Sequence, residues 1–539
     1  MFDKPLYLLS NVVIEPLIDR WYAWSHLVSP ATAALNITGR HLKIMNSFIQ
    51  APQVHEVAVK NPKMLGGPFM DIPKERVEDV KTLKEETIIS RQRMLDFSEA
   101  VKELDSMLKA NAHGYSLEPL YEKVPEILKG FVELVYDING NPSFRFFESL
   151  LYKSEYYDTT AQGIAMWLTD NDERPFVLST PRLKDKNSVY LNIPFSHSVI
   201  DVLAGMKRKP EYLSKVFDLI DIDEEDMPLF MSFFTEEAPP SYENYEGEFI
   251  RMRYFGHACV LIETKGVSIL IDPIVSYYGY QTEVERFSDF DLPDEIDYVL
   301  ITHNHQDHIL FETLLPLRHR IKNLVIPRTN SGTLQDPNLG LMFKNIGFKN
   351  IVEIDEMDTI SFDDCDIMGI PFVGEHSDLD IKTKLCYLVK IQEFSILFVA
   401  DSCNIEPKLY ERVHQQTGDV DVVMLGMECD GAPLSWLYGP LLMNELSREK
   451  DNSRRLAGSN YDRGMAIIDT FNPLEAYVYA MGQEPWLKFI SSIKYTDDSN
   501  PIVASNKLLE TCSKRGIIAE RLFGEKEILY SKFKEEVFA

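Results

Sequence analysis

The stretch LITHNHQDHI, residues 300–309, places three histidines and one aspartate within six positions, directly after a run that reads as a buried strand. Because side chains alternate along an extended segment, we expect His303 and His305 to lie on one face. Asp307 and His308 follow in the turn that leaves the strand and are expected to point to a second, neighbouring position. Imidazole and carboxylate are typical ligands of zinc, iron or manganese. The spacing therefore predicts two adjacent metal positions.

Short apolar runs typical of strands follow one another after residue 249, and helical patterns separate some of them at about 309–320, 405–416 and 455–469. The expected strands are 249–255, 259–264, 267–273, 298–303, 323–327, 366–372, 386–391, 394–402 and 421–427. Several of them stop at a polar residue, namely Asp272, His303, Asp401 and Glu428. Polar side chains at one edge of a sheet build the sites of α/β proteins. We therefore expect an α/β fold with sheets inside, helices outside and a site at this edge.

The acidic stretch 235–248, which contains Pro239 and Pro240, has the composition of a linker. Before it, residues 85–110 and 198–220 have helical spacing, and residues 131–150 predict two strands around an Asn-Gly turn. The sequence thus predicts an N-terminal α+β domain over residues 1–240 and a second domain over residues 241–539.

Charge and cysteine content limit the functional classes. A formal net charge of −29 disfavours nucleic acid and anionic membranes as partners. The six cysteines are scattered without a CxxC pair, which favours free thiols in a reducing compartment. No secretory signal pattern and no run of apolar residues long enough to span a bilayer is apparent. We expect a cytoplasmic protein.

The motif THNHQDH resembles the HxHxDH signature of the metallo-β-lactamase superfamily, whose fold is an αββα sandwich with a two-metal site. Residues 256–273, GHACVLIETKGVSILIDP, resemble its first strands, and Asp272 would then orient a metal ligand. The segment LFVADS resembles the strand that supplies a bridging carboxylate, here Asp401. The resemblance implies a C-terminal αββα metallo-β-lactamase-like sandwich.

Two departures from the hydrolases of this superfamily stand out. Glu375, with His376 beside it, stands where they place a third histidine. No histidine follows His414, so the late histidine is missing, and the matching stretch is YAMGQEPW, residues 479–486. More carboxylate and less imidazole favours iron over zinc. The pattern is similar to that of the dinuclear-iron β-hydroxylases of nonribosomal peptide and antibiotic biosynthesis, which also have a large N-terminal domain.

That resemblance assigns the ligands residue by residue. One iron would be held by His303, His305 and Glu375, and the other by Asp307 and His308. Asp401 would bridge the two ions and act with Glu375 as a catalytic carboxylate. Five further residues have two interpretations each. In the functional one, Glu428 is a third catalytic carboxylate, His257 orients a ligand, and Asp430, Trp436 and Tyr438 line a substrate channel. In the other, Glu428 is a surface acid at the end of a strand and the remaining residues only pack or lie at the surface.

The implied activity is an O₂-dependent diiron monooxygenase that β-hydroxylates an aminoacyl group held as a thioester on a nonribosomal peptide synthetase carrier protein. Two further electrons would come from a reductase, because the chain shows no flavin or nicotinamide motif. The N-terminal domain would serve homodimerisation or carrier docking. Since carrier proteins are usually acidic, docking would need a basic stretch, and 206–212, 317–322 and 447–455 are candidates.

Two other functional classes remain. A dinuclear zinc hydrolase of an ester, thioester, lactone or phosphodiester would use the same first four ligands. Glu375 and the missing late histidine argue against it. A scaffold that has lost its metals is disfavoured by the intact set of histidines and aspartates in 303–308 and by Asp401.

Overall fold

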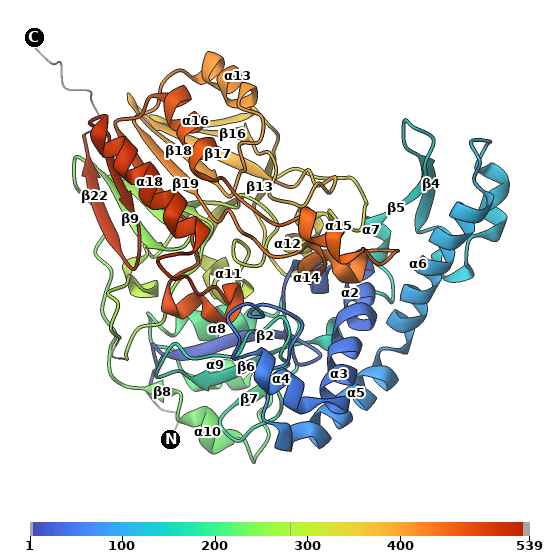
Figure 1. The fold of residues 1–539 in the computed structure, drawn as a ribbon. Helices are drawn as coiled ribbons and strands as arrows, with labels where there is room; N and C mark the ends of the chain where they lie inside the picture. Colours follow the sequence, from blue (N-terminus) through green and yellow to red (C-terminus); the bar gives the residue numbers. More distant parts are fainter. Residues whose placement is uncertain (1–3, 281, 532–539) are drawn as a thin grey trace, which may run out of the picture.

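The computed structural model describes residues 4–280 and 282–531, and two seven-stranded sheets form its centre (Figure 1). The first has the order β14-β13-β12-β11-β10-β9-β22, with bounds Ile351–Ile354, Ile321–Pro327, Ile296–Leu300, Val267–Ile271, Cys259–Thr264, Ile250–Gly256 and Lys526–Tyr530. The second has the order β15-β16-β17-β18-β19-β20-β21, with bounds Thr359–Phe362, Cys365–Pro371, Leu385–Ile391, Phe394–Ala400, Val422–Gly426, Glu475–Tyr479 and Ile518–Arg521. Each sheet combines antiparallel and parallel pairs.

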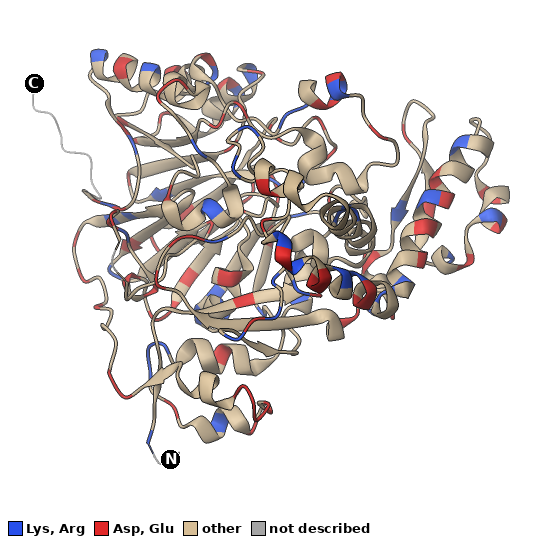
Figure 2. Cartoon of the chain, turned by 60° about the horizontal axis from the view of Figure 1, so that its bottom comes forward, with Lys and Arg blue, Asp and Glu red and all other residues tan. Residues whose placement is uncertain are grey.

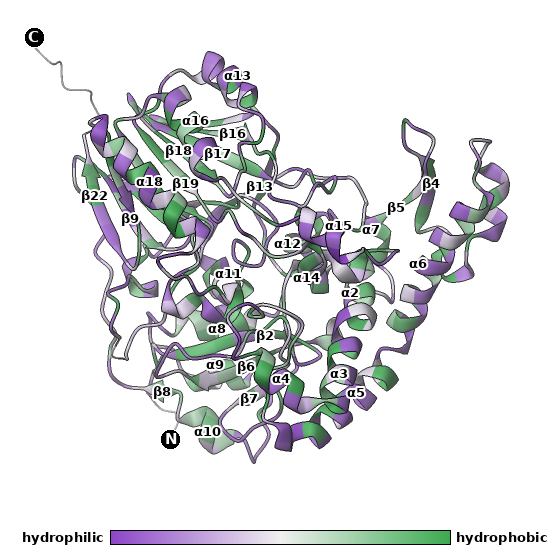
Figure 3. Ribbon diagram, in the orientation of Figure 1, coloured by the Kyte–Doolittle hydropathy of each residue, from purple (hydrophilic) through white to green (hydrophobic). Residues whose placement is uncertain are grey.

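The two sheets face one another across a dry core of alternating strand residues, including Ile262, Ile271, Val389 and Phe398. Helices α13 (Lys408–Thr417), α16 (Tyr461–Phe471) and α18 (Asn500–Lys514) cover the outer face of the second sheet. Helices α11 (Phe311–Leu317) and α12 (Leu339–Asn345) cover the first. Figure 3 shows the strands as mainly hydrophobic and the outer helices as mixed, so the C-terminal part is the expected αββα sandwich.

The N-terminal part is α+β, as expected from the sequence. A four-stranded antiparallel sheet has the order β3-β2-β6-β7, with bounds Trp21–Tyr22, Val12–Ile18, Gln162–Leu168 and Val189–Leu191. Its main helices are α1 (Ser25–Val28), α2 (Pro30–Asn36), α3 (Leu42–Gln50), α4 (Pro52–Ala58), α5 (Val77–Ser90), α6 (Gln92–Asn111), α7 (Glu148–Leu151), α8 (Ser198–Gly205), α9 (Leu213–Phe217) and α10 (Met227–Met231). The expected hairpin is β4 (Val132–Tyr136) and β5 (Pro142–Phe146), and β1 (Tyr7–Leu8) pairs with β8 (Phe234–Thr235).

The two parts share one hydrophobic core and a buried ion network. The core contains Leu27 and Phe97 from the N-terminal part together with Leu314 and Phe343 from the covering helices. Arg174 donates to both oxygens of Glu312 on α11, at 2.8 and 2.9 Å, and to Glu15 on β2 at 3.2 Å. A division into domains at residue 240 stays a prediction, because the two parts pack on one another over a continuous apolar interface.

The strand that precedes the histidine motif is shorter than expected. β12 ends at Leu300, whereas the sequence predicted a strand through His303. At Thr302 the chain leaves β13: the backbone N–H and the hydroxyl of Thr302 donate to the Asp272 carboxylate, at 2.8 and 2.6 Å, and its carbonyl accepts from the backbone N–H of Leu385 in the second sheet at 2.7 Å. Residues 301–310 therefore form a loop at the edge of the sheet, held in place by the aspartate that follows β11.

Charged residues of both signs are interspersed along the longer outer helices, such as α5, α6 and α18 (Figure 2). Within residues 4–280 and 282–531, no helix is long and apolar enough to cross a membrane.

Candidate metal centre

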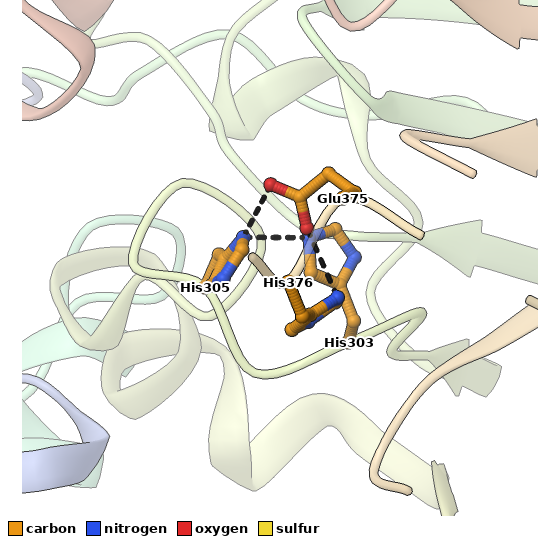
Figure 4. A group of neighbouring side chains, drawn as sticks. All are labelled: His303, His305, Glu375 and His376. Carbon is orange, nitrogen blue, oxygen red and sulfur yellow. Dashed lines mark hydrogen bonds and ion pairs between the residues drawn. The ribbon is translucent and has the colours of Figure 1, made fainter. Parts of the chain in front are cut away.

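Four buried side chains form the first group of donor atoms: His303, His305, Glu375 and His376 (Figure 4). His303 Nε2 lies 3.2 Å from His305 Nδ1, and His305 Nδ1 lies 3.2 Å from Glu375 Oε1. The second Glu375 oxygen is 3.1 Å from His376 Nδ1. The loop after β12 supplies the first two residues and the loop after β16 the other two, so both sheets contribute to this group.

A second group adjoins the first through His308 and Asp401. His308 Nε2 lies 3.0 Å from Asp401 Oδ2, and the same oxygen lies 3.8 Å from His303 Nε2. On the other side, Asp307 Oδ2 is 3.5 Å from His257 Nε2. The structure thus brings together all six predicted ligands, and one Asp401 oxygen faces a histidine from each half of the motif.

Asp272 fixes the orientation of His308, as the resemblance implied. Its Oδ2 lies 2.8 Å from His308 Nδ1, so the ring presents Nε2 to Asp401. A carboxylate behind a metal-binding histidine selects the tautomer and raises the basicity of the other nitrogen. The same carboxylate holds the loop through Thr302, so one buried side chain positions both the backbone and the ring.

The backbone at this edge is strained. Asp272, Glu375 and Ala400 adopt positive φ values of 40°, 64° and 48°. Left-handed backbone in non-glycine residues costs about 1–3 kcal/mol each and collects at functional sites. Asp272 and Glu375 carry carboxylates that face the histidines, and Ala400 directly precedes the third, Asp401. The strained backbone therefore directs these side chains into the pocket.

Burial and neighbouring charges oppose one another in the pocket. Burial and the adjacent imidazoles hold the pKa of His303 well below its usual range. For His308, burial acts in the same direction, but the carboxylates of Asp272 and Asp401 outweigh it and raise the pKa. Burial raises the pKa of Glu375, and His305 opposes that rise. Carboxylates and imidazoles in such proximity, away from solvent, are the donors that a cation requires.

Several buried donor atoms have no hydrogen-bond partner among the described residues. They include Asp401 Oδ1, His376 Nε2 and His257 Nδ1. Buried polar atoms without partners are rare in native proteins, and an ion is one accepted reason for them. Mixed imidazole and carboxylate donors suit iron, so the residues present fit a dinuclear iron centre.

Glu428 lies beside the pocket on the Asp401 side and outside the three donor groups. Its Oε1 accepts from the backbone N–H groups of Asp430 and Gly431, at 3.0 and 2.7 Å, while Oε2 is buried without a partner. Burial raises its pKa to about 7. Asp430 is exposed, and its carboxylate accepts a hydrogen bond from the Asn500 side chain. This contact involves no residue of the three donor groups and does not support the predicted role of Asp430 in a substrate channel.

Tyr438 reaches the histidines from α14 (Leu434–Tyr438), with its hydroxyl 2.9 Å from His305 Nε2. Arg40 of the N-terminal part fixes this helix by donating to the carbonyls of Trp436 and Leu437 at 2.8 and 2.6 Å. The His26 ring packs 6.1 Å from that of Tyr438. Neither His26 nor Arg40 stands in a motif, and a contact that spans almost 400 positions leaves no local pattern in the sequence.

The segment that replaces the late histidine packs behind the pocket. The backbone N–H of Ala480 donates to the His257 carbonyl at 2.8 Å. Glu484, 1% exposed, accepts from the Tyr254 hydroxyl and lies outside the three donor groups. This segment therefore supports His257 through its backbone and does not supply a carboxylate to the donor groups.

Comparisons with known proteins agree with this geometry. Residues 7–239 match the family model described as the diiron non-heme beta-hydroxylase N-terminal domain, and residues 251–438 match a beta-lactamase superfamily domain. Over 523 residues the chain is 38% identical to the 4-amino-L-phenylalanyl-[CmlP-peptidyl-carrier-protein] 3-hydroxylase of Streptomyces venezuelae, covering 96% of this chain and 98% of that protein. The crystal structure of CmlA, a diiron beta-hydroxylase from the same organism, superposes with a TM-score of 0.91 at 37% identity, covering 97% of this chain and 99% of that one.

Proposed function

The chain belongs to the family of diiron non-haem β-hydroxylases, and from that premise we propose that it hydroxylates the β-carbon of an aminoacyl group held as a thioester on a carrier protein. The observation that carries the proposal is Glu375, a buried carboxylate 3.2 Å from His305 at the position where the related hydrolases hold a histidine. The relative that covers nearly the whole chain acts, by its name, on a carrier-bound aminoacyl group.

In this proposal one iron would be held by His303, His305 and Glu375 and the other by Asp307 and His308, and Asp401 would be shared between them. The Asp401 oxygen that lies 3.0 Å from His308 Nε2 and 3.8 Å from His303 Nε2 supports the bridging role. His257 supports Asp307 from behind at 3.5 Å. The irons, when bound, supply the O₂ chemistry that no side chain provides.

The remaining side chains position this set and keep it dry. Asp272 selects the His308 tautomer, Tyr438 contacts the outer nitrogen of His305, and His376 contacts the second oxygen of Glu375. Such supporting contacts tune both ligand orientation and metal affinity. His303, His308 and His376 are almost completely buried, which limits the access of water to the donor atoms.

The proposed reaction also implies partners and a cellular location. Each turnover needs two electrons beyond those taken from the substrate, and a reductase would deliver them. Residues 1–240 would mediate homodimerisation or contact the carrier protein. The cytoplasm, where carrier proteins and reductases work, is the expected compartment.

The test is metal content together with product. Protein purified without chelators is expected to hold about two irons per chain and to show the optical band of an oxygen-bridged ferric pair. Supplied with a reductant, O₂ and 4-amino-L-phenylalanyl carrier protein, it is expected to form a hydroxylated aminoacyl thioester. Stoichiometric zinc with release of free amino acid would instead favour the hydrolase, which shares the same first four ligands.

A further inference from the structure

Two of the basic stretches that the sequence offered for carrier docking are not available for it. In 317–322, Arg318 and Arg320 are buried and paired with Asp201 and Asp289. In 206–212, Lys207 is buried and donates to the Val12 carbonyl at 2.6 Å. Arg318 links the two parts of the molecule, whereas Arg320 and Lys207 bind within their own parts, and none of the three forms a free positive surface.

The third stretch, 447–455, is only partly free. Arg454 donates to the Ser377 carbonyl at 2.8 Å, and Arg455 donates to the Asp430 carbonyl. Arg448 and Lys450 on α15 (Arg448–Ser453) are exposed, but Glu449 and Asp451 alternate with them. The helix therefore presents a mixed surface, and a positive surface has to be sought elsewhere.

A cavity of about 270 Å³ lies between the segment 59–71, which follows α4, and the segment 488–494, which contains α17 (Lys488–Ser491). In Figure 1 the blue loop after α4 lies next to the red chain below the large sheets. The volume approaches that of ordinary small-ligand sites. Its walls are mostly apolar: Val59, Met64, Leu65, Phe69, Phe176 and Ile493.

Both walls pack against segments that contact the metal pocket. A side chain added at Gly66 would lie 3.9 Å from the Trp436 ring, and α14 carries Tyr438 one half-turn further on, against His305. On the other wall, Ile493 packs on Gly482 in the loop after β20. That loop begins at Ala480, whose N–H holds the His257 carbonyl. The two segments that line the cavity, 59–71 and 488–494, thus each pack against a second segment, α14 or the loop after β20, and that second segment contacts the metal pocket.

The mouth of this cavity is positive in a chain whose net charge is −29. The segments 59–71 and 488–494 together carry four lysines and one acid, Asp71. Lys60 pairs with Glu56 and Lys488 with Glu173, both at 3.2 Å between exposed groups, where ion pairs are weak. Among the described residues, no acid lies within ion-pair distance of Lys63 or Lys494.

We propose that this cavity receives the phosphopantetheine arm of the carrier protein, with the lysines at its mouth binding the arm's phosphate and the acidic carrier surface. The inference rests on the proposed function for the identity of the partner. The arm's methyl and methylene groups match the apolar walls, and its phosphate matches the lysines. An arm lying between Gly66 and Ile493 would direct its thioester end along α14 towards Tyr438 and the histidines.

The experiment measures binding of free 4′-phosphopantetheine by calorimetry, so that no turnover is required. The iron-loaded protein is expected to bind it, and Lys488→Glu with Lys494→Glu is expected to weaken binding at least about tenfold. The matched control, Arg448→Glu with Lys450→Glu, reverses two charges on α15 and is expected to bind as the unmodified protein does. Equal binding by both double variants, or no binding by the unmodified protein, would overturn the inference.

A second pair of variants tests the apolar walls. Val59→Trp fills the cavity and is expected to abolish binding, whereas Val57→Trp changes a 71% exposed valine two positions away and is expected to leave binding intact. Iron content and the melting temperature verify folding of each. Coenzyme A binding tenfold tighter than phosphopantetheine would show a nucleotide site and overturn the carrier assignment. If the arm binds but no carrier-bound aminoacyl group is hydroxylated, the proposed function fails and the cavity assignment stands.

Discussion

The two ends of the metal pocket are built from different donors. At one end, His303, His305 and His376 surround the single carboxylate of Glu375, and Tyr438 closes the group. At the other end, His308 stands between the carboxylates of Asp307 and Asp401, with His257 behind Asp307. The first end is rich in imidazole and differs from a zinc site chiefly by Glu375. The second end is rich in carboxylate, which by itself favours iron. Metal identity should therefore depend most on Glu375, and metal pairing on Asp401.

The largest effect is expected for Asp401→Ala, which removes the side chain facing both ends. Losing the bridge separates the ions and leaves their charges uncompensated, so iron content should fall towards one per chain or below. Hydroxylated product should fall by more than about a hundredfold, beyond the effect usual for supporting residues. Iron analysis and single-turnover product formation measure both. The control is Asp462→Ala, at an exposed position in the first turn of α16. If Asp401→Ala keeps two irons and normal turnover, Asp401 is not the bridge.

Glu375→His makes the imidazole-rich end resemble a hydrolase site. The substitution replaces an anionic ligand with a neutral one, so we expect a higher zinc-to-iron ratio after growth with both metals and loss of hydroxylated product. Glu375→Gln keeps the shape of the side chain and removes its charge. Comparing it with Glu375→His therefore distinguishes the effect of losing the negative charge from the effect of introducing an imidazole. Unchanged iron loading and hydroxylation in the histidine variant would show that Glu375 does not bind metal.

Tyr438→Phe tests whether the first end depends on support from outside the sandwich. The hydroxyl contacts His305 Nε2 at 2.9 Å, and its loss removes the partner that fixes this ring. We expect iron affinity to fall about tenfold, the lower range for such supporting contacts, with the optical band shifted. Tyr461→Phe, whose hydroxyl contacts Thr511 far from the pocket, is the control. Identical metal titrations for both variants would mean that the first end needs no such support.

The smallest expected effect concerns Glu428, beside Asp401, and is a pH dependence of stability in metal-free protein. Burial raises its pKa from 4.5 to about 7, so the folded state holds a proton that the unfolded chain releases between these values. The free energy of unfolding therefore falls as pH rises through this window. Glu428→Gln should be more stable than the unmodified protein at pH 8, by about 1–3 kcal/mol, and similar near pH 4. Denaturant titrations at both pH values measure the difference, and a constant difference would contradict it.

Features that depend on residues close together in the sequence could be predicted, and features that depend on contacts between distant positions could not. The motif at 303–308 and the strands around it could be predicted because spacing and alternation report on neighbouring positions. Strand β2 was not predicted because its sequence, VVIEPLI, contains Glu15 and Pro16, yet all seven residues are buried. Glu15 is tolerated there because Arg174 and Arg182, more than 150 positions away, neutralise it.

The same limit applies to the site. Glu375 and Asp401 could be selected from the sequence because each follows a strand. Asp401 matches the pattern of the superfamily, and Glu375 departs from it. Arg40 could not, because it acts through the carbonyls of α14, and only the packing of the two parts brings it there. His376 adjoins Glu375 in the sequence, but its stacking on His305, with ring centres 4.5 Å apart, follows from a backbone turn that no periodicity predicts.

The shared hydrophobic core has a consequence for how the protein is made. A ribosome releases the N-terminal part first, but Leu27 and Phe97 belong to a core that also needs Leu314 and Phe343. Once residue 240 has been made, about 100 further residues, through Phe343, must emerge before that core closes, which takes roughly 5–20 s at the usual rates of synthesis. During that time, roughly 5–20 s, the nascent N-terminal part has an apolar face uncovered, and chaperones can bind it. Slower translation of the 241–345 stretch should lower the yield of folded enzyme without changing a single residue.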